Sequence, residues 1–173
     1  MNNSQIEDLV KELPSPFKER IEFLINNPRL GNKPIGLRPY GGVVKPNCNG
    51  TSVFILGGEI LVKAGVVDNV VSPCFAPKNV TEYFPGKIRP GYVRPALMKD
   101  ALANKTTFFR KPNIDVLDLV TFWSGGELTH SMIAVSKDIG INQIGWGGIF
   151  GPIYIEDYRK TFLEEIKVYG VRR

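Results

Sequence analysis

The spacing of apolar residues changes along the chain, and this change limits the possible folds more than any other feature. In residues 1–104, apolar positions recur mainly at helical intervals. Beyond them, runs rich in β-branched residues predict strands over 116–123, 130–136 and 141–146. Helices followed by successive strands are typical of an α+β domain with an antiparallel sheet, because a parallel sheet needs strands and helices to alternate.

Polar residues and prolines mark the expected helix ends. Ser4 and Glu7 match a capping box at the start of the first helix, which Pro14 ends. Pro16 suits the start of a second helix, and Pro28 ends it. The remaining expected elements are helices over 48–56, 96–104 and 156–167, a short extended segment over 152–155 and an edge strand over 168–171.

One cysteine and the single histidine form the candidate catalytic pair. Asn47 is a good N-cap for a helix that starts at Cys48, and the positive end of a helix dipole favours a thiolate. An imidazole beside the sulfur could accept its proton and hold the thiolate as an ion pair. The sequence therefore predicts Cys48 as a nucleophile and His130 as its base; a buried structural thiol and a core histidine are the alternative.

Further polar residues are candidates for orienting the imidazole or contacting a substrate. A third polar group must hold the other ring nitrogen of the base. Asn142, in the next predicted strand, is the first candidate, and Gln143 is the second. Tyr40, Asn47, Asn49 and Gln143 are candidate substrate contacts, with packing of Tyr40 in a loop as the alternative for that residue.

The ligands needed for a metal site are not clustered in this sequence. One histidine and two separated cysteines do not make a zinc site, so we expect no metal. Residues 145–148 are glycine-rich, but no Lys-Ser/Thr pair follows them, so they do not form a phosphate loop. We expect no cofactor.

Positive charge is concentrated in residues 78–111. This segment holds eight Lys or Arg and two acidic residues, whereas the whole chain has a net charge of +5. Such a segment can favour an anionic surface as a partner, and a solvated surface is the alternative. Its aromatic residues do not form a recognisable nucleic-acid module, so we do not expect nucleic-acid binding.

The N-terminal residues do not resemble an export signal. They lack an apolar region after a basic one, and no apolar run elsewhere is long enough to span a bilayer. We expect a soluble protein that is cytoplasmic as made, and any export would use a non-classical route.

Several segments together resemble the NlpC-type, papain-like cell-wall peptidases. Tyr40 to Gly42, followed by Asn47 to Gly50, is similar to that family's nucleophile segment, a tyrosine and a glycine pair leading to Asp-Cys-Ser-Gly at a helix start. Residues 117–122 resemble its Pro-Gly-Asp-Leu-Val-Phe-Phe strand, and residues 129–135 resemble its histidine strand. The helix expected near 94–104 falls where the family has one.

The resemblance implies a single papain-like domain over residues 1–173, with N-terminal helices packed on an antiparallel sheet. It implies Cys48 as nucleophile, His130 as base and Asn142 as the orienting residue, while Asp118 becomes a structural turn residue. The expected parts are a helical extension (1–34), the nucleophile segment (35–67), an irregular basic insertion (68–94) and a sheet region with a final helix (95–173).

The function implied by the resemblance is cysteine-dependent hydrolysis of an amide bond in a peptide, such as a bacterial cell-wall stem peptide. A peptide or peptidoglycan-like substrate is then the expected partner. Two alternatives stay open: an effector or toxin acting as a thiol protease or acyltransferase on non-wall substrates, and a catalytically silent module that binds an anionic surface.

Overall fold

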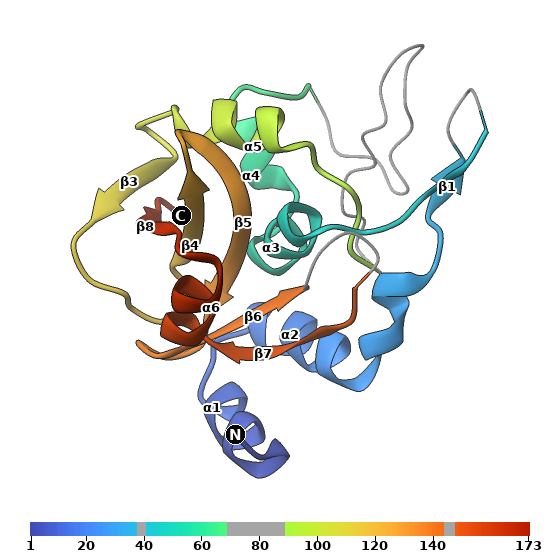
Figure 1. Ribbon diagram of the computed structural model, residues 1–173, viewed down its shortest axis with the longest axis vertical. Coiled ribbons are helices and arrows are strands. Elements are labelled where there is room, and N and C mark those ends of the chain that lie inside the picture. The colour runs from blue at the N-terminus through green and yellow to red at the C-terminus, as the bar shows by residue number, and fades with distance from the viewer. Residues whose placement is uncertain (38–40, 69–88, 144–147) are drawn as a thin grey trace.

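The structure is a computed structural model that describes residues 1–37, 41–68, 89–143 and 148–173 (Figure 1). Tyr40, Cys74 and most of the predicted 68–94 insertion lie outside these ranges. Within the described residues, none of the helices has the length and apolar character needed to cross a bilayer.

A six-stranded antiparallel sheet forms the centre of the fold. Its strand order is β3-β8-β4-β5-β6-β7, and every neighbouring pair is antiparallel. The strands are β3 (Phe108–Lys111), β4 (Leu119–Ser124), β5 (Glu127–Ala134), β6 (Ile139–Gln143), β7 (Phe150–Tyr154) and β8 (Glu165–Val171). The predicted α+β class with an antiparallel sheet is therefore confirmed.

Helices cover both faces of this sheet (Figure 1). The first five are α1 (Asn3–Lys11), α2 (Phe17–Asn26), α3 (Cys48–Leu56), α4 (Glu59–Lys63) and α5 (Pro95–Leu102). Their buried side chains share one apolar core with Leu119, Ile133 and Ile141 of the sheet. On the other face, α6 (Ile155–Phe162) packs Ile155 and Tyr158 against a smaller cluster. The predicted N-terminal extension thus contributes to the main core.

The segment between α2 and α3, which is dense in proline and glycine, contains short regular elements. It contains a 3-10 helix, η1 (Pro28–Asn32), and a short hairpin of β1 (Gly36–Leu37) and β2 (Val43–Val44). The cap of α1 also differs from the prediction. Asn2 Oδ1 accepts from the backbone N–H of Gln5 (2.9 Å), and Gln5 Oε1 accepts from that of Asn2 (3.0 Å), so these residues form the capping box in place of Ser4 and Glu7.

The end of the chain corrects two predictions. The last helix stops at Phe162, because Leu163 adopts a left-handed conformation (φ 52°) and reverses the chain. The residues that follow form β8, which lies between β3 and β4 and is therefore an interior strand, not the predicted edge strand. The edge strand on this side of the sheet is β3, which the sequence did not predict, and β7 forms the other edge.

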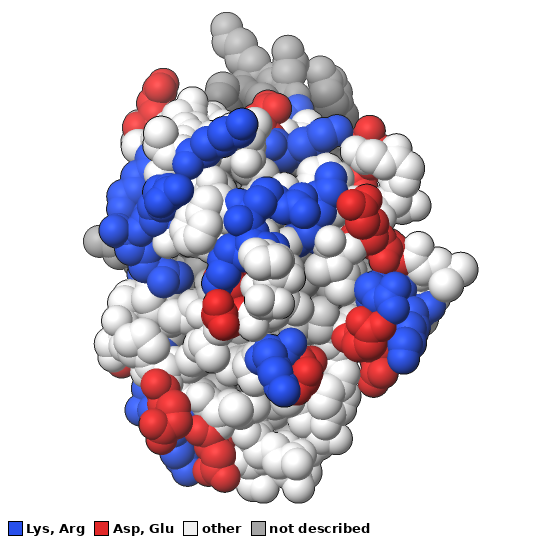
Figure 2. All heavy atoms as spheres, turned by 90° about the vertical axis from the view of Figure 1, so that its left-hand side faces the viewer, with Lys and Arg blue, Asp and Glu red and all other residues white. Residues whose placement is uncertain are grey.

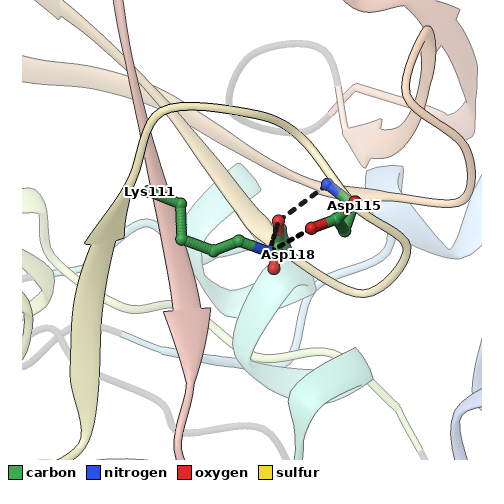
Figure 3. A network of polar contacts seen from close by, with 3 residues as sticks. All are labelled: Lys111, Asp115 and Asp118. Carbon is green, nitrogen blue, oxygen red and sulfur yellow. Dashed lines mark hydrogen bonds and ion pairs between the residues drawn. The ribbon is translucent and has the colours of Figure 1, made fainter.

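A polar network explains why β4 starts at Leu119 and not at the predicted residue 116. Leu117 has a φ of 66°, and the carboxylate of Asp118 accepts from the backbone N–H of Asp115 (2.8 Å). Lys111 Nζ lies 2.6 Å from Asp115 Oδ2 and 2.7 Å from Asp118 Oδ2 (Figure 3). The Asp118 side chain is 8% exposed and that of Asp115 is 71% exposed, so only Asp118 is a buried partner.

We expect Asp118→Ala to lower the free energy of unfolding by about 2 kcal/mol, because it leaves Lys111 without its buried partner and an N–H without an acceptor. Asp115→Ala is the matched control, and it should cost less than about 1 kcal/mol because that pair is solvent-exposed. Urea denaturation of both variants measures the difference. Equal losses would contradict the structural role of Asp118.

Candidate active site

The N-terminus of α3 is fixed by Asn47. Its side-chain oxygen accepts from the backbone N–H groups of Gly50 (2.8 Å) and Val93 (3.1 Å), and its amide nitrogen donates to the Val93 carbonyl (2.7 Å). A Cβ atom on Gly50 would lie 1.8 Å from the carbonyl oxygen of Gly91, so this close approach requires glycine. The predicted cap at Asn47 and helix start at Cys48 are confirmed.

Hydrogen bonds hold α3 against β5 beside the cysteine. Asn49 Oδ1 accepts from the hydroxyl of Ser131 (2.8 Å), and the hydroxyls of Ser52 and Ser131 are 3.1 Å apart. Cys48 Sγ lies 3.9 Å from Asn49 Oδ1. Since Ser131 follows His130 directly in β5, these bonds bring the start of α3 to the strand that carries the histidine.

His130 sits where β5 and β6 separate. The two strands pair at Ile133–Ile141 and Ala134–Gly140, and His130 and Asn142 lie beyond this pairing. There the Nε2 atom of His130 is 3.1 Å from the side-chain nitrogen of Asn142. His130 is the fourth residue of β5, whereas the sequence predicted that it begins the strand. The predicted neighbour of the imidazole, Asn142, is thus in contact with it.

Cys48 and His130 line the same cavity, which has a volume of about 590 Å³. The described part of its wall also includes Asn47, Asn49, Tyr92, Thr129 and Tyr158. Cys48 is half-buried, and His130 is only 2% exposed. Of the expected substrate contacts, Asn47 and Asn49 therefore border the cavity, although both amides are already engaged in holding α3.

Gln143 is buried away from this cavity. Its amide nitrogen lies within hydrogen-bonding distance of the carbonyls of Gly31 (3.1 Å), Pro46 (2.9 Å) and Gly148 (3.0 Å), and its oxygen accepts from the Thr51 hydroxyl (3.0 Å). These bonds connect β6 with α3, η1 and the chain before β7. We therefore assign Gln143 a structural role in place of the expected substrate contact or orienting role.

Tyr158 is a site residue that the sequence did not indicate. It lies on α6, and its ring stacks on the imidazole of His130 with a centroid distance of 4.4 Å and an interplanar angle of 20°. Burial raises the pKa of its hydroxyl, and the charge of Glu164 acts in the same direction. The amphipathic pattern over 156–167 indicated a helix, but it carried no signal of which strand the tyrosine would meet.

Burial dominates the electrostatics of the pair. It raises the pKa of the Cys48 thiol, although backbone N–H groups of Ser131 and Asn49 act in the opposite direction. It also lowers the pKa of His130 from 6.5 to about 4. Both shifts favour uncharged groups, so the resting pair is a neutral thiol and a neutral imidazole. The predicted thiolate–imidazolium ion pair is disfavoured because the cavity desolvates both charges.

Among the described residues, the Cys48 sulfur forms no hydrogen bond with the imidazole. Asn142 occupies Nε2 of the imidazole, which leaves Nδ1 as the nitrogen available to a thiol. As the side chains lie, the nitrogen of Asn142 donates to Nε2, which places the ring proton on Nδ1. For Nδ1 to accept a proton, the Asn142 amide must turn so that its oxygen accepts from Nε2–H. General-base activation of the thiol therefore requires this tautomer and the approach of Nδ1 to the sulfur during attack.

Among the described residues, no three His, Cys, Asp or Glu side chains are grouped so that they could hold a metal ion. No protein family, curated protein or solved structure shows significant similarity to this chain.

Proposed function

We propose that this protein is a cysteine-dependent hydrolase of amide bonds, with a papain-like arrangement of its site. One observation carries the proposal: a cysteine at the start of a buried helix and an imidazole held by an amide line one cavity. The resemblance to the NlpC-type peptidases, which rests on residues 35–146, also supports it.

In the proposed mechanism, Cys48 attacks the substrate carbonyl while His130 accepts the thiol proton. Backbone N–H groups at the start of α3 lack intrahelical partners, and that of Cys48 can stabilise the oxyanion. His130 then protonates the leaving amine, and water releases the acyl group from the sulfur. With its amide oxygen turned towards Nε2–H, Asn142 would hold the imidazole in the tautomer that these steps require.

The proposed substrate class is a peptide amide, and a bacterial cell-wall stem peptide is the example that the resemblance suggests. Non-wall substrates and acyl transfer to an acceptor other than water are alternatives within the same chemistry, because both begin with the same acyl-enzyme.

A catalytically silent binding module is the second candidate. The observation that favours it is the direction of the two pKa shifts, since a neutral thiol is less reactive than a thiolate. A turnover assay distinguishes this candidate from the enzyme. The pH dependence of Cys48 alkylation by iodoacetamide does so less well, because a thiol that is activated only during attack also reacts slowly with that reagent.

Labelling with a peptidyl vinyl sulfone, followed by mass spectrometry, tests the proposal alongside a peptide-amidase assay on cell-wall fragments. We expect the label on Cys48 and the loss of both label and turnover in Cys48→Ala. The matched control is Cys74→Ala, which removes the other thiol and should keep both signals. Full turnover by Cys48→Ala would refute the thiol mechanism.

A further inference from the structure

A second cavity lies at the β3 edge of the sheet and shares no residue with the proposed active site. Its volume is about 520 Å³, within the range of roughly 300–1,000 Å³ that is usual for small-molecule sites. Three cationic side chains border it, together with an aromatic and aliphatic wall. These cations are Lys105, Arg110 and Arg172, and the described part of the lining contains no acidic residue.

Aromatic rings hold the two guanidinium groups in place. Arg110 pairs with Tyr169 across β3 and β8, and its guanidinium lies 5.4 Å from the centroid of that ring. The guanidinium of Arg172 lies 4.7 Å from the ring centroid of Phe109, and its backbone N–H donates to the Thr107 carbonyl (2.9 Å). Arg172 Nε also donates to the Lys105 carbonyl (3.5 Å). The other N–H groups of a guanidinium on an aromatic face can still donate to a further partner.

The charge of this cluster is not compensated within the described part of the chain, where none of its three cations forms an ion pair with a carboxylate. The next residue along β3, Lys111, differs because it is paired with two aspartates. Figure 2 shows that Lys and Arg gather over the upper half of the face to which β3 belongs, while acidic side chains are fewer there. The surrounding charge therefore adds to the attraction for an anion.

We propose that this cavity binds a phosphate monoester. Such a group carries about −1.5 to −2 charges at pH 7 and offers three acceptor oxygens, which suits two guanidinium forks and one ammonium group. A carboxylate would balance only one of the three cations. The wall formed by Leu102 and Phe108 suits the organic part of the ester. The proposal does not depend on hydrolase activity.

Calorimetric titration of the full chain at low salt tests the site with two probes of the same chemistry. Glycerol 3-phosphate represents a soluble ester, and phosphatidylcholine vesicles containing phosphatidic acid represent a lipid headgroup. Saturable binding of either probe supports the site. Binding of both probes, or of glycerol 3-phosphate alone, identifies the ligand as a free phosphate ester. Binding of the vesicles alone assigns it to the headgroup. Binding of neither probe overturns the proposal.

Variants separate the site from general charge attraction. Arg110→Gln with Arg172→Gln should weaken binding at least about tenfold, since each removes a charge-assisted hydrogen-bonding partner. Lys11→Gln with Lys160→Gln removes the same charge elsewhere and should leave affinity unchanged. Arg110→Lys keeps the charge but loses the fork, and it should also weaken binding. Equal weakening by both double variants would overturn the proposal.

Discussion

Replacing His130 with alanine is expected to reduce kcat/KM for amide hydrolysis by about a thousandfold, because positioned general bases contribute roughly 10²–10⁴. The chain has no other histidine, so no second imidazole can take over. Because burial holds Cys48 as a neutral thiol, the nucleophile depends on proton transfer during attack more than a preformed thiolate would. Initial rates on the peptide amide cleaved by the wild type measure the loss.

The controls for this experiment separate chemistry from folding. Asn142→Ala should cause a smaller loss than His130→Ala, since it removes the group that orients the base and leaves the base itself. Asp115→Ala changes an exposed ion pair outside the cavity lining and should retain wild-type kcat/KM. A His130→Ala protein that keeps its fold and its full rate would show that the imidazole is not the base.

The features that the sequence predicted well are governed by local interactions. The helix Cys48–Leu56 was predicted from its cap, and Asn47 makes the capping bond in the structure. The order of β4, β5 and β6 also followed from the sequence, because successive strands joined by short turns pair as neighbours. This order brings Asn142 beside His130, twelve residues apart in the chain.

The features that the sequence missed depend on tertiary packing. The interior position of β8 follows from its pairing with both β3 and β4, and no pattern within residues 165–171 specifies those partners. The role of Gln143 changed for a similar reason, because its bonding partners lie far away in the chain. The stacking of Tyr158 on His130 likewise needs the placement of α6 on the sheet.

The sequence predicted a thiolate–imidazolium ion pair between Cys48 and His130, but burial disfavours both charges. The helix dipole and the candidate imidazole can be inferred from the sequence, whereas desolvation cannot. Burial is a property of the assembled core, and His130 is surrounded by Phe122, Tyr158 and the start of α3. Its effect on the pKa of His130 is large enough to appear in the stability of the protein as a function of pH.

We expect the free energy of unfolding to fall by about 3 kcal/mol as the pH drops from 6.5 to 4, through His130 alone. The pKa is about 4 in the folded state and 6.5 ordinarily, so the unfolded chain binds more protons in this interval. The stabilisation is therefore complete above pH 6.5 and is lost as the pH falls towards 4. Urea unfolding at pH 7 and pH 4.5 measures most of this loss.

His130→Gln isolates the contribution, because the carboxylates that titrate in the same interval are present in both proteins. The variant should lose less stability on acidification than the wild type, even if it is less stable at pH 7, since glutamine takes up no proton. Parallel losses would mean that the imidazole titrates normally when folded and is solvated. The cavity would then not desolvate the pair, and Cys48 could exist as the thiolate that the helix dipole favours.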